Sequence, residues 1–302
     1  MRLSHLTRAL LGGLLLTGGI QVAVQAQEPT GTLDKIKEAN AITLGHRESS
    51  IPFSYYDDQQ QVIGYSQEIA LQVVEAIKRE LGLPDLKVRL NPVTSQNRLP
   101  LVQNGTVDLE CGSTTNNTER QRQVAFSNSI FVVGTRLLTR KGSGVQDVGD
   151  LAGKTLVTTA GTTSERLSRK LNEDQQLGMR IISAKDHGES FLMLETGRAA
   201  AFMMDDALLY GELAKARHPG DWVVVGQPQS LEAYGCMLRK DDPEFKKLVD
   251  ATIAGLQTSG EAQRIYAKWF ESPIPPKGLN LNFPLSAAMV ELFAHPNDNA
   301  LQ

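Results

Sequence analysis

The segment Thr155–Asn172 reads TLVTTAGTTSERLSRKLN, and its pattern decides the fold class. Its first five residues are apolar or β-branched, which predicts a short buried strand. A glycine and three hydroxyl residues follow at Gly161–Ser164, and a helix is expected from Glu165 to Asn172. A strand that passes through a polar turn into a helix is the repeating unit of a parallel α/β sheet.

The same order recurs on both sides of this segment. Toward the C-terminus we expect strands at 180–183, 199–204 and 222–225, with helices at 189–195 and up to about 216. Toward the N-terminus we expect strands at 42–45, 86–90 and 106–109, with helices at 33–40, 66–81 and up to 103. Further helices are expected at 244–256, at 261–270 and near 287–293. Two separate runs of alternating strands and helices predict two α/β lobes.

Two extended segments, 130–139 and 234–238, lie where one run changes to the other. No proline- or serine-rich linker separates the runs, so these segments are expected to cross between the lobes. We therefore predict a discontinuous first lobe of residues 27–135 and 232–302, with residues 136–231 inserted as the second lobe. Each lobe should hold a mostly parallel sheet flanked by helices.

The N-terminus has the features of a secretory signal peptide over residues 1–26. Arg2 and Arg8 precede a short apolar run at 9–16, and Val24-Gln25-Ala26 is a small-residue cleavage site. An uncleaved membrane anchor is the alternative, but the apolar run is short for one. We expect a protein exported to the periplasm.

Export makes the only two cysteines informative. Cys111 and Cys236 would meet an oxidising compartment, where an even pair usually forms a disulfide; two buried free thiols are the alternative. A bond would close a loop of about 125 residues, which stabilises the fold by about 4–5 kcal/mol in the chain-entropy treatment. It would also require residue 236 to return beside the first lobe.

Charge and histidine spacing exclude some classes of partner. Removing residues 1–26 takes away two arginines and no acids, which leaves 29 basic against 34 acidic residues. A mildly acidic chain argues against nucleic acid as a partner. The five histidines are scattered and no CxxC motif occurs, which argues against a metal site, and no cofactor is expected.

The richest polar stretch is Cys111–Arg120, CGSTTNNTER, which follows the expected strand at 106–109. Asn116 and Glu119 have the spacing of a capping box, so a helix is expected to begin there. Free N–H groups at a helix start, together with the Arg120 guanidinium, would make a receptor for a carboxylate. An ordinary polar turn with a surface arginine is the alternative.

Further polar residues lie just past other expected strands, where ligands bind in open α/β sheets. The candidates are Arg47, Ser95, Arg98, Ser113, Thr115, Arg120, Thr163, His187 and Asp205. Each alone has an ordinary structural explanation, such as a surface arginine or an N-cap aspartate. Together, three arginines and a histidine beside hydroxyls and an aspartate suit a ligand with two carboxylates and one ammonium, such as an acidic amino acid.

At these residues the chain resembles a known family. The segments concerned are Gly45–Ser50, Thr94–Arg98, Cys111–Arg120, Ser183–Gly188 and Phe202–Asp206. They are similar to those of the periplasmic glutamate/aspartate-binding proteins, which are the solute-capturing components of ABC importers. The resemblance covers essentially the whole chain after the signal peptide, and it implies a two-lobed type II periplasmic binding fold.

The resemblance also implies a role for each candidate. Arg120, Thr115 and Ser113 would hold the main-chain groups of L-glutamate or L-aspartate, and Asp205 would meet the α-ammonium. Arg47, Ser95, Arg98 and His187 would take the side-chain carboxylate, and Thr163 would contribute from the second lobe. One position departs from the wider superfamily, which usually has threonine three residues before the arginine, where this chain has Asn117.

The implied partners are the inner-membrane permease subunits of an ABC importer with its cytoplasmic ATPase, and the protein is expected to be a monomer. Two other classes remain as alternatives. An enzyme on the same fold, such as a dicarboxylate dehydratase, would need a general acid or base, for which His187 is the candidate. An amino-acid sensor module would need a signalling domain.

Overall fold

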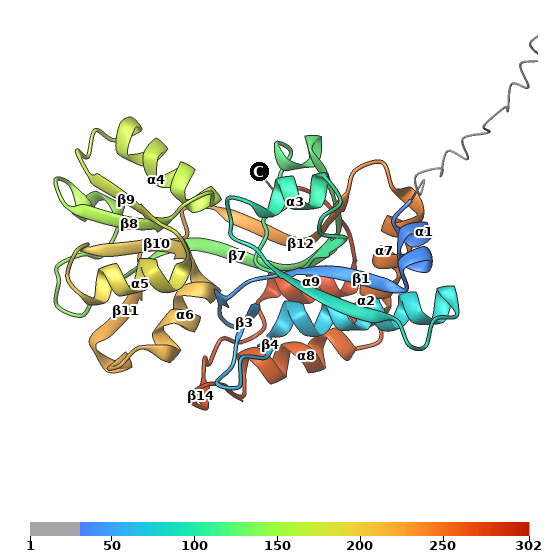
Figure 1. The fold of residues 1–302 in the computed structure, drawn as a ribbon. Coiled ribbons are helices and arrows are strands. Elements are labelled where there is room, and N and C mark those ends of the chain that lie inside the picture. Colours follow the sequence, from blue (N-terminus) through green and yellow to red (C-terminus); the bar gives the residue numbers. More distant parts are fainter. Residues whose placement is uncertain (1–30, 302) are drawn as a thin grey trace, which may run out of the picture.

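The computed structural model describes residues 31–301, and the predicted signal peptide at residues 1–26 lies outside this range. Figure 1 shows two groups of elements with two long strands running between them. The first lobe contains α1 (Thr32–Ala39), β1 (Ala41–His46), β2 (Ser49–Ser50), β3 (Ser54–Tyr56), β4 (Val62–Ile63), α2 (Tyr65–Leu81), β5 (Lys87–Pro92), α3 (Arg98–Gln103), β6 (Leu109–Glu110), η1 (Arg120–Arg122), α7 (Pro243–Thr258), α8 (Glu261–Phe270), β13 (Pro273–Ile274), β14 (Leu279–Asn280) and α9 (Ala287–Ala294).

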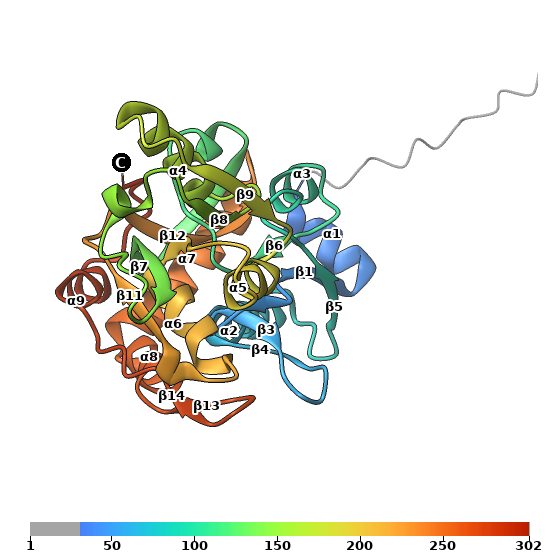
Figure 2. The same ribbon diagram turned by 90° about the vertical axis from the view of Figure 1, so that its left-hand side faces the viewer.

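The second lobe contains the elements between the two crossing strands. These are η2 (Val148–Leu151), β8 (Thr155–Thr159), α4 (Thr163–Asp174), β9 (Arg180–Ala184), α5 (His187–Glu195), β10 (Ala201–Asp205), α6 (Asp206–Lys215), η3 (Pro219–Asp221) and β11 (Trp222–Val225). Figure 2 views the molecule from this end, with the elements of the second lobe in front of those of the first. The predicted boundaries at residues 135/136 and 231/232 stay a prediction.

The crossing strands are β7 (Val124–Arg140) and β12 (Leu231–Arg239). The first half of β7 pairs antiparallel with β12, and its second half pairs antiparallel with β10 and β11. On either side the sheet is parallel, with β5–β1–β6 in the first lobe and β10–β8–β9 in the second. The predicted fold class is therefore confirmed.

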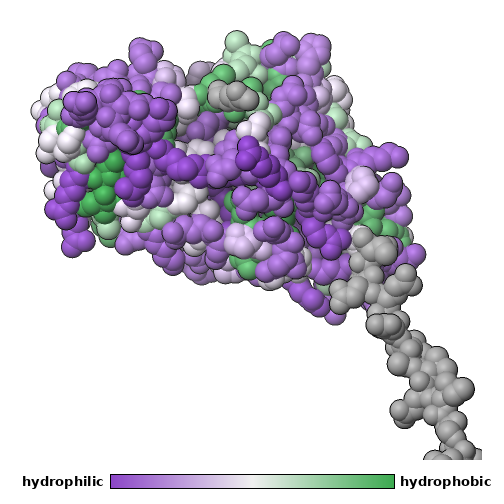
Figure 3. Space-filling model, turned by 90° about the horizontal axis from the view of Figure 1, so that it is seen from above, coloured by the Kyte–Doolittle hydropathy of each residue, from purple (hydrophilic) through white to green (hydrophobic). Residues whose placement is uncertain are grey.

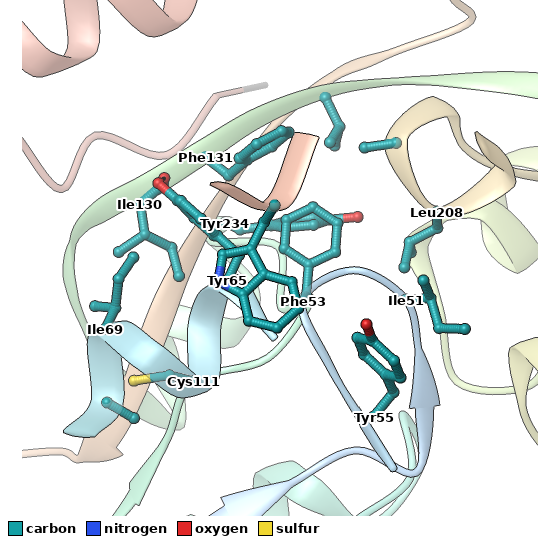
Figure 4. Packing of buried hydrophobic residues seen from close by; sticks show 14 of the residues in the cluster. Ile51, Phe53, Tyr55, Tyr65, Ile69, Cys111, Ile130, Phe131, Leu208 and Tyr234 are labelled. Atoms are coloured by element: carbon teal, nitrogen blue, oxygen red, sulfur yellow. Dashed lines mark hydrogen bonds between the residues drawn. The ribbon is translucent and has the colours of Figure 1, made fainter. Parts of the chain in front are cut away.

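An aromatic core lies where the crossing strands meet the first lobe. Figure 4 shows Phe53, Tyr65, Phe131 and Tyr234 packed around one another. The ring centroids of Phe53 lie 4.9 Å from Phe131 and 5.2 Å from Tyr234, both edge-on. Such pairs add about 0.5–1.5 kcal/mol each beyond the area they bury. Because Phe131 is on β7 and Tyr234 on β12, this core holds both crossing strands against the first lobe.

The predicted disulfide is confirmed. Cys111 and Cys236 are bonded, with their Cα atoms 4.3 Å apart and 125 residues between them in sequence. The bond joins the polar loop after β6 to the middle of β12. It therefore fixes the position of this loop beside the crossing strands.

The predicted helix beginning at Asn116 is wrong. Only the three-residue 3-10 helix η1 forms there, and it starts at Arg120. Asn116 does not cap it, because its backbone N–H donates to the carbonyl of Ala233 at 2.8 Å and its side chain donates to the carbonyl of Asp298 at 2.8 Å. The side-chain oxygen of Asn117 instead accepts from the N–H of Arg120 at 2.9 Å. A helix macrodipole therefore contributes nothing to this loop.

One further expectation differs from the structure. The strand expected at 106–109 is only Leu109–Glu110, because the preceding residues form a turn. The aromatic segment at 52–58 contributes to the small antiparallel sheet β2–β3–β4. That sheet lies directly after Arg47 and supports it, since the backbone N–H of Arg47 donates to Ser54 Oγ at 2.9 Å.

The C-terminal segment after α9 packs against the polar loop and the crossing strands. The carbonyl of Asn297 accepts from the N–H of Ser129 on β7 at 2.7 Å. The carbonyl of Asp298 accepts from Asn116, and its carboxylate pairs with Lys246 on α7 at 2.9 Å. Asn297 and Asp298 are thus part of the support of this loop.

Within residues 31–301, no helix combines the length and the apolar character that crossing a bilayer requires. Figure 3 shows a mostly hydrophilic face with apolar side chains in separate patches. The apolar area is therefore concentrated in the interior, as the clusters of buried residues also indicate.

Candidate functional site

The structure brings the nine candidate residues together between the lobes. Eight are buried, with 1–5% of their surface exposed, and Thr163 is half-buried. Each lies where a strand ends or a helix begins. They are Arg47, Ser95, Arg98, Ser113, Thr115 and Arg120 from the first lobe, and Thr163, His187 and Asp205 from the second.

Two of the three arginines converge on Ser113. Arg47 follows β1 and donates from Nη1 to Ser113 Oγ at 3.3 Å. Arg98, the first residue of α3, donates from Nη1 to the carbonyl of Ser113 at 2.9 Å. A guanidinium has five N–H donors, so both groups retain donors beyond these contacts.

Arg47 packs closely against this loop at Gly112. A β-carbon at Gly112 would lie 3.1 Å from Arg47 Cγ and 2.4 Å from Glu110 Oε1. A side chain at residue 112 would therefore require the Glu110 carboxylate to turn away and Arg47 to shift slightly.

The third arginine, Arg120, joins the lobes. Its Nη1 donates to the carbonyl of Thr115 at 2.8 Å, and its Nη2 donates to the carbonyl of Gly161 at 3.4 Å. Thr115 belongs to the first lobe and Gly161 to the turn before α4. Arg120 therefore lies at the boundary between the lobes.

The loop that carries Ser113 and Thr115 is held on β12 by its backbone. The N–H of Gly235 donates to the carbonyl of Thr114 at 3.1 Å, and Thr115 forms a bridge with Tyr234. Together with the Cys111–Cys236 disulfide, these bonds fix the loop on a strand that itself reaches the second lobe. The hydroxyls of the loop are thus placed by rigid structure.

The second-lobe residues lie at the starts of helices. Thr163 begins α4, capped by Thr162, and His187 begins α5, capped by Asp186. Nδ1 of His187 lies 2.9 Å from Thr159 Oγ1, which fixes the ring. The Thr163 and Thr115 Oγ1 atoms are 3.4 Å apart across the boundary between the lobes.

Asp205, at the end of β10, is surrounded by hydroxyl donors. Its Oδ1 accepts from Thr135 and from Ser164, each at 3.1 Å, and its Oδ2 accepts from Tyr234. Tyr234 is on β12 and also belongs to the aromatic core. Asp205 is therefore anchored to both crossing strands.

Sequence reasoning missed two acids in this region. Glu110, fully buried, accepts from Thr114 Oγ1 at 2.7 Å, and Thr114 in turn accepts from Arg98. Glu232, on β12, accepts from Thr163 Oγ1 at 2.8 Å and from Thr115 Oγ1. The available signal was a charged residue inside an otherwise apolar strand, since both have apolar neighbours in sequence.

These acids change the charge count on which the sequence reading relied. With Asp205, Glu110 and Glu232, the region holds three carboxylates beside three guanidinium groups. The candidate set of three arginines and one aspartate therefore understates the acids of the region. Glu110 is linked to Arg98 through Thr114, and Glu232 shares Thr115 with Arg120.

Burial and mutual repulsion lower the pKa values of the cationic groups. Burial and the neighbouring Arg98 lower the pKa of Arg47 to about 10 and that of Arg120 to about 9. Both arginines thus stay charged at neutral pH. Burial, followed by Arg47, Arg98 and Lys215, lowers the pKa of His187 well below its ordinary value, so its ring is neutral at pH 7.

Several polar atoms on the arginine side find no hydrogen-bond partner among the described residues. They are Ser95 Oγ, Arg98 Nε and His187 Nε2. Buried polar groups are normally hydrogen-bonded, because leaving one unpaired costs about 1–3 kcal/mol. Three such atoms, from both lobes, are therefore available to a polar ligand.

The lobes meet closely at Gly161. A β-carbon there would lie 2.9 Å from the backbone N and Cα of Gln96, across the boundary, and φ at Gly161 is +77°. A glycine is therefore required for this contact both by its backbone conformation and by the space available.

The chain was compared with known proteins. A profile of the bacterial extracellular solute-binding proteins, family 3, matches residues 42–272. The glutamate/aspartate import solute-binding protein of Salmonella typhimurium is 63% identical over 301 residues, which covers 100% of both chains. The L-glutamate/L-aspartate-binding protein of Pseudomonas aeruginosa is 62% identical, covering 97% of this chain and 98% of the other.

Among solved structures, holo ArgBP from T. maritima superposes with a TM-score of 0.67 at 26% identity, covering 78% of this chain and 98% of that one. The profile and the relatives span most of the chain, and the solved structure has the same two-lobed architecture. The chain belongs to the bacterial extracellular solute-binding proteins of family 3.

Proposed function

We propose that this protein captures L-glutamate or L-aspartate between its lobes in the periplasm and delivers it to the permease of an ABC importer. The single observation that carries the proposal is the convergence of Arg47, Arg98 and Arg120, all at most 3% exposed, on the loop at Ser113–Thr115. Relatives at 62–63% identity that bear glutamate and aspartate in their names support it.

The arrangement suits an acidic amino acid at both ends. Arg47 and Arg98, with Ser95 and neutral His187, offer donors for the side-chain carboxylate. Arg120 and the Ser113–Thr115 loop face the main-chain groups, and Asp205 provides a carboxylate for the α-ammonium. In this proposal Thr163, His187 and Asp205 complete the site when the lobes close, so the ligand stabilises the closed state.

Calorimetric titration of the purified protein with the twenty amino acids tests the proposal. We expect L-glutamate and L-aspartate to bind most tightly, with L-glutamine and L-asparagine much weaker because they leave Arg47 and Arg98 without an anionic partner. Equal affinity for glutamate and glutamine would overturn the assignment of the arginine side. Absence of binding to any amino acid would overturn the proposed function itself.

Export and assembly are the finer parts of the proposal. Membership of an extracellular family supports export, and the residue pattern at 1–26 supports a cleaved signal peptide. N-terminal sequencing of protein recovered from the periplasm checks the cleavage after Ala26. Sedimentation of the purified protein with and without glutamate checks the expected monomer.

A further inference from the structure

Glu232 holds two hydroxyls that belong to different lobes. Its Oε2 accepts from Thr163 Oγ1 at 2.8 Å and from Thr115 Oγ1, and its Oε1 accepts from Ser230 Oγ at 3.2 Å. Its residue exposure is 6%. Within residues 31–301 it forms no ion pair with a lysine or arginine. A nearly buried carboxylate thus lies beside the main-chain end of the site and contacts hydroxyls only, while its negative charge acts on the nearby Arg120 and opposes the lowering of the pKa of that group by burial.

The directions of these hydrogen bonds restrict what the two threonines can do. A carboxylate only accepts, and a hydroxyl has one hydrogen to donate and two lone pairs with which to accept. While Glu232 takes the hydrogens of Thr115 and Thr163, both hydroxyls have only lone pairs left for a ligand. Lone pairs attract a cationic N–H donor and do not bind a carboxylate.

A second acid lies on the same side. Asp205 accepts from Thr135, Ser164 and Tyr234, and within the described chain it too lacks an ion pair. Burial and the negative charge of Glu232 raise the pKa of Asp205. Two buried carboxylates that repel each other are stabilised by a cation that reaches both.

We propose that Glu232 is a further specificity-determining residue, which turns the hydroxyls of Thr115 and Thr163 into acceptors and, with Asp205, recognises the α-ammonium of the ligand. This inference rests on the proposed function and assigns its amino-group selectivity. Arg120 remains the group that meets the α-carboxylate, because its guanidinium only donates. The site thereby rejects dicarboxylates that lack an amino group.

The test compares two ligands on three proteins by isothermal titration calorimetry. L-glutamate carries the ammonium, and glutarate has both carboxylates and no ammonium. The proteins are the wild type, Glu232→Gln, and the control Glu291→Gln, whose side chain is 75% exposed on α9. We expect Glu232→Gln to weaken glutamate by at least about 30-fold, which corresponds to loss of one partner of a desolvated charge pair.

Glutarate should bind Glu232→Gln at least as well as the wild type, so that the gap between the ligands narrows, and the control should leave both affinities unchanged. Equal weakening of both ligands would show a merely structural role and overturn the proposal. Tighter glutamate binding would also overturn it, because it would mean that Glu232 competes with a ligand carboxylate.

Thr163→Val provides a second variant if Glu232→Gln does not fold. Thr163 is half-buried at the start of α4, and valine removes the acceptor lone pairs while keeping the shape. We expect a selective loss of glutamate over glutarate here as well, and an unchanged ratio contradicts the proposal. If the wild type binds neither ligand, the proposed function fails, which is distinct from failure of the role of Glu232.

Discussion

The two sides of the candidate site have opposite chemistry. The first-lobe side presents Arg47, Arg98 and Arg120, and the side formed by β10 and β12 presents Asp205 and Glu232. Burial is the main cause of the lowered pKa values of Arg47 and Arg120 and of the raised pKa of Asp205, and a like charge adds to it in each case, Arg98 for the arginines and Glu232 for Asp205. A ligand with two carboxylates and one ammonium reduces the repulsion among the arginines and the repulsion between Asp205 and Glu232.

This difference explains why a count of charges is a poor guide to the ligand. With Glu110 and Glu232 counted, three acids face three arginines, and their positions differ. Glu110 is linked to Arg98 through Thr114, Glu232 and Arg120 both contact Thr115, and Asp205 lies on β10. Specificity therefore follows from the arrangement of the charges, and each prediction below alters one part of that arrangement.

The largest effect is expected from removing the arginine that faces the main-chain carboxylate. Arg120→Ala should abolish measurable binding of every amino acid, because every amino acid has this carboxylate and Arg120 also bridges to Gly161. Calorimetry measures it, with the exposed neighbour Arg122→Ala as the control. Unchanged glutamate affinity in Arg120→Ala would refute the assignment.

Arg98→Ala tests the group that is proposed to bind the side-chain carboxylate of the ligand. Loss of one partner of a buried charge pair costs about 2–5 kcal/mol, so glutamate should weaken by about 30-fold to several-thousand-fold. Glutamine should weaken much less, because its side-chain amide is neutral, and the gap between the two ligands should narrow. Arg89→Ala, an exposed arginine on β5, is the control. An equal loss for both ligands would place Arg98 elsewhere.

Gly161→Ala leaves every candidate ligand-binding side chain in place and is expected to hold the two lobes apart. The added β-carbon would lie 2.9 Å from the Gln96 backbone, and overpacking of this kind costs about 1–3 kcal/mol, or roughly 5- to 150-fold in affinity. Small-angle scattering should show that the variant remains more open than the wild type in saturating glutamate.

Gly153→Ala is the matched control for this variant. Its φ of +69° imposes similar backbone strain, but no atom lies within 4 Å of the added carbon. If both variants lose the same affinity, backbone strain alone explains the result and contact between the lobes is not responsible.

The smallest effect is expected from pH. Because the pKa of Asp205 is raised above its ordinary value of 3.8, the folded protein holds this proton more tightly than the unfolded chain. Stability without ligand should therefore fall as the pH rises from 3.8 through the raised pKa. Glutamate affinity should change the opposite way and weaken as the pH falls from 8 toward 5.5, by at most about tenfold per pH unit.

Titration calorimetry across this range checks the effect of pH. The Asp205→Asn variant should bind glutamate weakly, and its affinity should not change with pH over this range. His187 should contribute little, because burial and the nearby Arg47 lower its pKa well below the ordinary value. A pH dependence that persists in Asp205→Asn assigns the titration to another group.

Much of the fold follows from local patterns in the sequence. The strands Thr155–Thr159 and Trp222–Val225 and the helix Glu261–Phe270 have the predicted bounds, because apolar periodicity and turn residues act within a few neighbours. The helix expected at Asn116 failed because a distant segment, at Ala233 and Asp298, takes the hydrogen bonds that a cap requires.

Site residues that come just after a strand could be predicted from the sequence, and site residues within a strand were missed. Arg47 and Asp205 lie at the predicted edge because parallel strands end together. Glu110 and Glu232 lie inside β6 and β12, where sequence gives no indication of which face of the strand meets the arginines. Glu232 depends on a contact far along the chain, with Thr115 at a separation of 117, and Glu110 depends on how the loop after β6 turns back so that Thr114 donates to it.

The packing of the segment after α9 has a practical consequence for anyone who engineers this molecule. Asn297 and Asp298 lie against β7, α7 and the loop that leads to Arg120. A fluorescent reporter fused directly to the carboxyl end would pull on that loop, so a biosensor built on this scaffold is better attached elsewhere. The surface turn at Lys141–Gly144, exposed and remote in sequence from the site residues, offers a safer insertion point.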